Sequence, residues 1–291
     1  MAQRRDISKA RSNSVSRRWH HWRPRFRRHR EEPKWEPEQI DHLTKMIDQL
    51  KYRVKSASKE EKRALLEKLL VLQTPRAALA QQQMDRHHGG YHNREKRLFD
   101  LIDFNDTFVS SVLAQPYDQL NTFVARIKAV MERFTTSQHS LMFTDEQFDA
   151  IVRGLAREIA VYLGARSQGL RAVMTSRTED AFGIDMIVRD DALGVTVNID
   201  VKTPSAFRYR LEELEREGRI TTEELLEADK NDFVTVINRH NDERIPVTIM
   251  CVRAERLGNV VNFRFENEPA LAQLIRRIMI SGSDQSARQQ R

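Results

Sequence analysis

The composition of this 291-residue chain excludes a membrane protein, because 40% hydrophobic and 31% charged residues with a mean hydropathy of −0.63 are typical of a soluble protein with a core. Its aliphatic runs, such as residues 247–252, are far shorter than the ~20 residues that span a bilayer, so we expect no transmembrane helix. The net charge is +7, and the one cysteine, Cys251, excludes an intramolecular disulfide and favours the reducing cytoplasm.

The positive charge is concentrated at the N-terminus. The first 30 residues hold ten arginines and one lysine against Asp6, a net charge of +10, whereas the remainder carries −3. Prolines and the lack of apolar periodicity predict that residues 1–36 are a disordered basic arm. Guanidinium groups pair with phosphates and aromatic rings stack on bases, so we expect this arm to bind nucleic acid. The candidate binding residues are Arg17, Arg18, Trp19, Trp22, Arg23, Arg25, Phe26, Arg27 and Arg28.

Three other interpretations of the arm stay open. The first alternative is a disordered arm with no specific partner. The second is a segment that binds an anionic membrane, and the third is an organelle transit peptide.

Residues 37–135 are predicted to form a helical accessory region. Apolar residues between positions 40 and 54 alternate at spacings of three and four, and Ser58 with Glu61 forms a capping box for a second helix. We expect a helical hairpin whose apolar stripe is an intramolecular core. The alternative is a short coiled-coil seam that forms a homodimer through these helices.

A loop is expected at residues 81–93, which are polar and contain a glycine pair. Its histidines, His87, His88 and His92, have no acidic or cysteine companion at ligand spacing, so a solvated loop is favoured over a metal site. Two further packing helices follow before residue 135.

Residues 140–280 have the element order of a mixed α/β domain. Thr144 and Gln147 form a capping box that begins a helix, which we expect to end at Gly164. Three strands, a charged helical segment and a fourth strand come next, giving the order αβββαβ. The predicted strands are residues 170–175, 184–188, 195–201 and 245–253.

The remaining segments of this domain are less regular. Residues 234–237 fit both a strand and a helical stripe, and we interpret them as helix. Residues 260–265 add a further strand, and residues 269–280 form a last amphipathic helix. Residues 281–291 are predicted to be a disordered polar tail.

Two acidic residues and a lysine stand out in the predicted strands. Residues 195–202 alternate apolar and polar side chains, so Asp200 and Lys202 share one strand face. Asp185 interrupts the preceding apolar strand, and antiparallel pairing would bring the two carboxylates together. Paired carboxylates repel each other and form a ready site for a hard cation such as Mg²⁺, with water and phosphate oxygens as further ligands.

These residues resemble the PD-(D/E)xK nuclease superfamily, the restriction-endonuclease-like fold, over about residues 144–265. The resemblance implies that Asp185, Asp200 and the helical Glu158 bind Mg²⁺, with Mn²⁺ as a substitute. It also implies that these acids and Lys202 are catalytic, and that Lys202 positions or activates the attacking water. Asp185 follows Gly-Ile, where the motif has a proline. The residues that carry the resemblance are Gly183-Ile184-Asp185, Asp200-Val201-Lys202 and Glu158.

The sequence contains three acid-x-lysine triplets, and only one of them ends a predicted strand that follows another acid-bearing strand. Glu32-Pro33-Lys34 lies in the arm and Glu60-Glu61-Lys62 in the first turn of a helix, whereas Asp200-Val201-Lys202 ends a strand that follows an acid-bearing strand. The structural alternative is an exposed charge pair of Asp200 and Lys202, with Asp185 capping a turn.

Four further acids near these strands are expected to be solvated loop residues. The alternatives are that two of them bind the metal and that a serine and an arginine contact a phosphate. The acids are Glu179, Asp180, Asp190 and Asp191, of which the first two are the alternative ligands, and the phosphate candidates are Ser176 and Arg177.

The sequence therefore predicts an intracellular, Mg²⁺-dependent endonuclease that hydrolyses phosphodiester bonds, with DNA favoured by the resemblance and the arm raising affinity. A non-catalytic nucleic-acid-binding or assembly protein on the same fold is one alternative, and a structural protein whose arm binds membrane or ribosome is another. Because an inactive site need not keep Asp185, Asp200 and Lys202 together, the enzyme is favoured.

Overall fold

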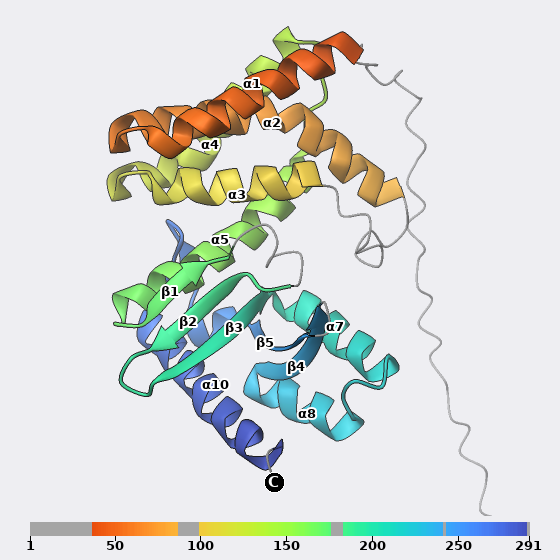
Figure 1. The fold of residues 1–291 in the computed structure, drawn as a ribbon, viewed down its shortest axis with the longest axis vertical. Coiled ribbons are helices and arrows are strands. Elements are labelled where there is room, and N and C mark those ends of the chain that lie inside the picture. Colours follow the sequence, from red (N-terminus) through yellow and green to blue (C-terminus); the bar gives the residue numbers. More distant parts are fainter. Residues whose placement is uncertain (1–36, 87–98, 176–182, 241–242, 290–291) are drawn as a thin grey trace, which may run out of the picture. The chain divides into compact units, whose positions relative to one another are not determined.

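The computed structural model describes residues 37–86, 99–175, 183–240 and 243–289. Every candidate nucleic-acid-binding residue of the arm lies outside these ranges, as do the three histidines of the predicted loop. The described chain has a mixed α/β fold built on a five-stranded sheet (Figure 1). None of the helices within these ranges has the length and apolar character that crossing a bilayer requires.

The sheet has the strand order β1-β2-β3-β5-β4. Strands β1, β2 and β3 are antiparallel neighbours, β3 and β5 are parallel, and β4 returns antiparallel along β5. The parallel pair brings the carboxyl ends of β3 and β5 to the same edge of the sheet. The strands are β1 (Arg171–Met174), β2 (Met186–Asp190), β3 (Val195–Lys202), β4 (Phe233–His240) and β5 (Glu243–Cys251).

Helices cover both faces of this sheet. α5 (Asp145–Ser167) and α10 (Glu268–Gln289) pack over one face, where Ile199 and Val201 of β3 point into their core. α7 (Pro204–Arg216) and α8 (Thr222–Asn231) share a second core with Ile249 and Cys251 of β5. The alternation along β3 therefore directs Asp200 and Lys202 away from the α5 core.

The start of α5 is as predicted, but its end is not. The Thr144 hydroxyl accepts from the Gln147 backbone and the Gln147 side chain accepts from the Thr144 backbone, which completes the capping box. The helix passes through Gly164 to Ser167. A Cβ atom at Gly164 would lie 2.7 Å from the Leu271 side chain, so this glycine permits close packing on α10 and does not end the helix.

The interpretation of residues 234–237 as helix is wrong. They lie within β4, which pairs along its whole length with β5, and the Thr235 and Thr248 hydroxyls form a cross-strand hydrogen bond of 2.9 Å. β-Branched side chains that find cross-strand partners outweigh the helical spacing. The observed order therefore contains a strand that the predicted αβββαβ order lacks.

Residues 260–265 form two short strands where one was expected. β6 (Val260–Val261) and β7 (Arg264–Phe265) follow α9 (Ala254–Leu257) and pair around a turn at Asn262 and Phe263. Both turn residues have positive φ, 48° and 61°.

The N-terminal helices are α1 (Pro37–Ser56), α2 (Lys59–Arg86), α3 (Phe99–Leu113) and α4 (Leu120–Ser137), with the 3₁₀ turn η2 (Tyr117–Gln119) before α4. The predicted hairpin of α1 and α2 is confirmed, and the α1 stripe of Leu43, Ile47 and Leu50 is buried against α2 within the chain. A homodimer through these helices would therefore need other residues.

Two helices extend beyond their predicted ends. α2 continues to Arg86, into the segment expected to be a loop, and α10 continues to Gln289, through most of the expected tail. Once a helix is nucleated by its packed residues, each added residue gains a backbone hydrogen bond, so polar residues prolong it.

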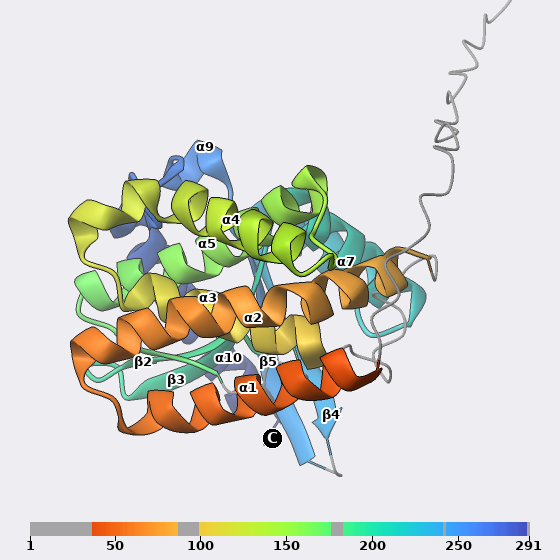
Figure 2. The same cartoon turned by 90° about the horizontal axis from the view of Figure 1, so that it is seen from above.

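The N-terminal helices form a further layer on the α5 side of the sheet (Figures 1 and 2). Phe104 and Phe108 of α3 and Phe123 of α4 share a core with Phe148 of α5. Phe263, at the tip of the β6–β7 turn, enters the same core, with its ring centroid 6.4 Å from that of Phe108.

Candidate active site

Strand register places Asp185 opposite Asp200. Met186 pairs with Ile199 in the antiparallel β2–β3 ladder, and the Asp185 amide donates to the Ile199 carbonyl at 2.9 Å. Continuing this register by one residue sets the two acids across from each other on one face. The expected approach of the two acidic residues is therefore observed.

Lys202 lies next to Asp200 on the same strand. Its ammonium donates a hydrogen bond to Asp200 Oδ1. Asp200 is only 6% exposed, and the Lys202 side chain is 26% exposed. The charge pair that the structural alternative predicted exists, but its acid is buried and not exposed.

The environment of Asp185 disfavours its charged form. The Val201 amide donates to Asp185 Oδ2 at 2.7 Å. Even so, the pKa of Asp185 is raised well above its usual value, first because the protein removes water from the carboxyl and then because of the negative charge of Glu158. Asp200 adds to this effect, while Lys202 and the Val201 amide oppose it only in part.

The environment of Lys202, in contrast, favours its charged form. Burial alone would lower its pKa, but the nearby charges of Asp200, Asp185 and Glu158 outweigh burial, so the pKa of Lys202 is raised. Lys202 is therefore an ammonium ion at physiological pH. The charge of Glu158 on α5 contributes to the pKa shifts of both Asp185 and Lys202.

We call Glu158, Asp185, Asp200 and Lys202 the acid–lysine cluster. Asp185 and Asp200 lie across from each other by strand register, and Lys202 donates a hydrogen bond to Asp200. In the ranges that the structure covers, no three acidic, histidine or cysteine side chains are placed to hold one metal ion together. Asp185 and Asp200 still suit Mg²⁺, which commonly takes one or two carboxylates and fills its other positions with water and substrate phosphate oxygens.

Two neighbouring residues shape the cluster. Gly183 has a φ of +73°, and a Cβ atom there would lie 3.9 Å from Asp200 Oδ2, so the turn before β2 passes directly beside that carboxylate. Thr175 was missed as a site residue. Its hydroxyl donates to the carbonyls of Ile184 and Asp185, the latter at 3.0 Å, and holds the Asp185 backbone against β1. The available signal was a threonine at the end of a predicted strand.

Two of the nearby acids that were expected to be solvated lie within the described residues, and one of them is buried while the other is exposed. The expectation that Asp190 is solvated is wrong, because it is 5% exposed, accepts from the Ala192 and Leu193 amides and pairs with Arg276 of α10. This turn-capping carboxylate connects the β2–β3 turn to α10. Asp191 is exposed and pairs with arginines of β1 and β2. The other predicted polar residues, Ser176, Arg177, Glu179 and Asp180, lie outside the described residues.

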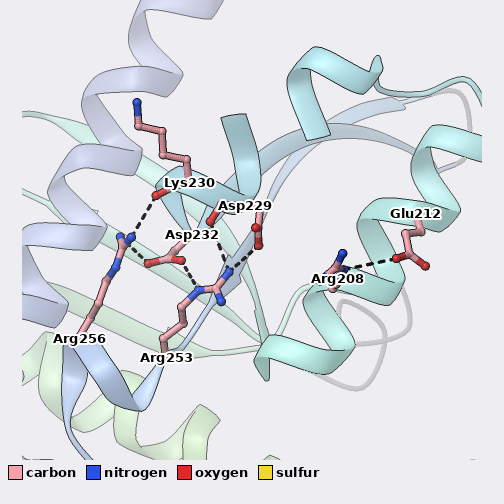
Figure 3. Close-up of polar contacts among 7 residues, drawn as sticks. All are labelled: Arg208, Glu212, Asp229, Lys230, Asp232, Arg253 and Arg256. Carbon is pink, nitrogen blue, oxygen red and sulfur yellow. Dashed lines mark hydrogen bonds and ion pairs between the residues drawn. The ribbon is translucent and has the colours of Figure 1, made fainter. Parts of the chain in front are cut away.

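A second charged cluster lies where α8 meets the end of β5 (Figure 3). Asp232 is 1% exposed, has a left-handed backbone with φ of 68°, and accepts from Arg253 and Arg256 at 2.6 Å each. Arg253 also pairs with Asp229 at 2.6 Å. The hydrogen bond to Asp232 is the main reason that the pKa of Arg253 is raised. We call these four residues the aspartate–arginine cluster.

Comparison with protein-family models, with curated proteins and with solved structures found no match. The interpretation of the acid–lysine cluster therefore depends on its own geometry and charge.

Proposed function

We propose that the chain is a metal-dependent nuclease that hydrolyses phosphodiester bonds of nucleic acid. The observation that carries this proposal is the acid–lysine cluster, in which strand register sets Asp185 opposite Asp200 beside the Lys202 ammonium, and burial followed by the charge of Glu158 raises the pKa of Asp185. Two buried carboxylates that approach each other favour binding of a cation.

In this proposal Asp185 and Asp200 hold Mg²⁺, or Mn²⁺ in its place, through carboxylate oxygens, and Glu158 adds negative charge from α5. When bound, the ion would supply a water of lowered pKa and would neutralise charge that develops on the phosphate. The protein keeps both carboxylates on one face of the sheet through the register of β2 and β3.

Lys202 acts as a hydrogen-bond donor and a positive charge. Because its pKa is raised, it cannot accept a proton at neutral pH, so it positions the attacking water or a phosphate oxygen and does not serve as the base. Its hydrogen bond to Asp200 holds the ammonium beside that carboxylate at the end of β3.

DNA is favoured as substrate by the resemblance to PD-(D/E)xK nucleases. The basic arm would raise affinity by pairing with backbone phosphates, independently of sequence. Such contacts add binding energy to the reaction without taking part in bond cleavage.

A second candidate is a nucleic-acid-binding or assembly protein that does not cleave. One observation favours it: the ion pair of Lys202 with Asp200 already neutralises one of the acids.

The two candidates are separated by incubating the full chain with linear, circular, single-stranded and branched DNA and with RNA, with and without Mg²⁺ or Mn²⁺. Metal-dependent cleavage that is lost in Asp200→Asn and Asp185→Asn but kept in Asp191→Asn supports the nuclease. Asp191 is the matched control because it is an exposed acid in the turn between the same two strands. Binding without cleavage under every condition would favour the second candidate.

A further inference from the structure

A cavity of about 390 Å³ lies where strands β3 and β5 end. Its wall includes Pro204, two residues after Lys202, and Val252, whose amide donates to the Lys202 carbonyl at 3.0 Å. Arg157, the neighbour of Glu158 on α5, also lines it. The cavity is thus adjacent to the carboxyl ends of both parallel strands.

Two arginines on consecutive turns of α5 line this cavity, Arg153 and Arg157. The Arg157 guanidinium donates to the Arg153 carbonyl at 2.8 Å. Burial, followed by the positive charge of Arg153, lowers the pKa of Arg157. Over the part of the chain that the structure describes, neither guanidinium has a carboxylate ion-pair partner, unlike the arginines of the aspartate–arginine cluster.

The remaining wall is partly apolar and carries one acid. Val152, Val260 and Phe265 supply apolar surface, and Glu255 of α9 is the acid. Two guanidinium groups against one carboxylate leave an excess of one positive charge.

We infer that this cavity is a phosphate-binding subsite, in which Arg153 and Arg157 hold a backbone phosphate of the nucleic-acid strand next to the phosphate at the acid–lysine cluster. This inference rests on the proposed function for the identity of the strand. Guanidinium groups bind phosphate oxygens through paired N–H donors, and such bonds are strongest where water is partly excluded. The apolar wall provides surface for the adjoining sugar or base, and the volume lies in the ~300–1,000 Å³ range of small-ligand sites.

The subsite is tested by arginine modification on the full chain, with a metal chelator present so that no cleavage occurs. Phenylglyoxal modification is mapped by mass spectrometry with and without a short single-stranded oligonucleotide. We expect the oligonucleotide to slow modification of Arg153 and Arg157 several-fold and to leave Arg133, an exposed arginine of α4, unchanged. Because each arginine is read separately, phosphate binding by the basic arm does not obscure the result.

Variants provide the second measurement. Arg157→Ala should weaken oligonucleotide binding by about tenfold, the range of a charged hydrogen bond, whereas Arg133→Ala should have much less effect. Arg157→Lys should fall between them, because a lysine keeps the charge but not the paired donors. Glu255→Gln should strengthen binding by removing the acid from the cavity wall. Melting curves confirm that each variant is folded.

The outcomes separate this inference from the nuclease. Protection of both arginines in a chain that shows no metal-dependent cleavage would support the subsite without the nuclease. Cleavage by a chain whose Arg153 and Arg157 are not protected would overturn the subsite alone, as would equal losses in Arg157→Ala and Arg133→Ala. Protection by inorganic phosphate or a mononucleotide but not by the oligonucleotide would also overturn it, because the source would then be a free phosphate.

Discussion

The two charged clusters of this fold differ in charge balance. In the aspartate–arginine cluster, Asp229 and Asp232 pair with Arg253 and Arg256 at 2.6 Å, so each charge has a partner (Figure 3). In the acid–lysine cluster Asp200 pairs with Lys202, whereas Asp185 accepts a hydrogen bond from the Val201 amide, and burial followed by the charge of Glu158 raises the pKa of Asp185.

This difference indicates which cluster serves stability and which serves function. A buried charge with an oppositely charged partner stabilises the folded chain or lowers its free energy of unfolding only slightly. Buried like charges that lie close together lower the free energy of unfolding. Unbalanced groups are found where a ligand or a reaction supplies the missing charge. The comparison therefore predicts opposite responses to removing an acid from each cluster.

The largest effect is expected on cleavage. Asp200→Asn keeps the shape of the side chain but removes the charge that would hold the metal, so metal-dependent cleavage should fall on the order of 10²–10³-fold or more. Nucleic-acid binding should be kept or improved, because repulsion of the phosphates is reduced. Cleavage and binding are measured on the same preparations, and unchanged cleavage would exclude this cluster as the active site.

The next largest effect is expected on stability. Asp232→Ala removes the shared acceptor of Arg253 and Arg256, and we expect a loss of about 2–3 kcal/mol in the free energy of unfolding. This is less than the ~3–5 kcal/mol of a fully buried pair because both guanidinium groups reach water. Asp232→Asn should lose less, since it keeps an acceptor and tolerates the left-handed backbone. Urea denaturation checks both, and equal losses would contradict the pairing argument.

A smaller effect of opposite sign is expected at Asp185. Its pKa is higher in the folded chain than in the unfolded chain, so its stabilising contribution is complete below the unfolded pKa and is lost as pH rises through the folded pKa. Asp185→Asn cannot ionise and should therefore melt a few degrees higher than the natural chain at neutral pH without divalent metal.

The same argument gives the pH dependence of that difference. It should shrink as the pH falls below the ordinary range of an aspartate, where both chains carry a neutral side chain at this position. Melting curves across this pH range test the sign. A variant that melts lower at neutral pH would show that Asp185 stabilises the fold as an anion.

The smallest effect is expected at Cys251. Burial raises the pKa of this thiol to about 12, with the charges of Asp232 and Asp229 adding to the shift against the opposing influence of Arg253. At neutral pH the folded chain should react with a thiol reagent far more slowly than the urea-unfolded chain. Comparable rates would show that the carboxyl end of β5 opens readily.

The sequence predicted those parts of the fold that depend on local pattern. Alternation in residues 195–202 predicted both β3 and the shared face of Asp200 and Lys202, and the capping box predicted the start of α5. β4 was missed because its β-branched residues also fit a helical stripe, and only pairing with β5 decides between them.

Local sequence pattern also predicted the two central acids of the candidate site, but not the cavity lined by Arg153 and Arg157. The approach of Asp185 to Asp200 follows from antiparallel pairing of two adjacent strands. The arginine cavity could not be predicted, because α5, the start of α7 and the segment after β5 meet only in the folded chain. In the sequence, Arg153 and Arg157 are indistinguishable from solvated helix residues.

The turn between β6 and β7 connects the helical layer to the arginine cavity. Phe263 adopts a left-handed backbone that bulky residues avoid, and burial of its ring beside Phe108 offsets this conformational cost. The strands on either side of this turn carry Val260 and Phe265, which form part of the cavity wall. Local unfolding that releases Phe263 from the helical layer therefore also releases that wall, which makes the accessory helices and the cavity one cooperative unit.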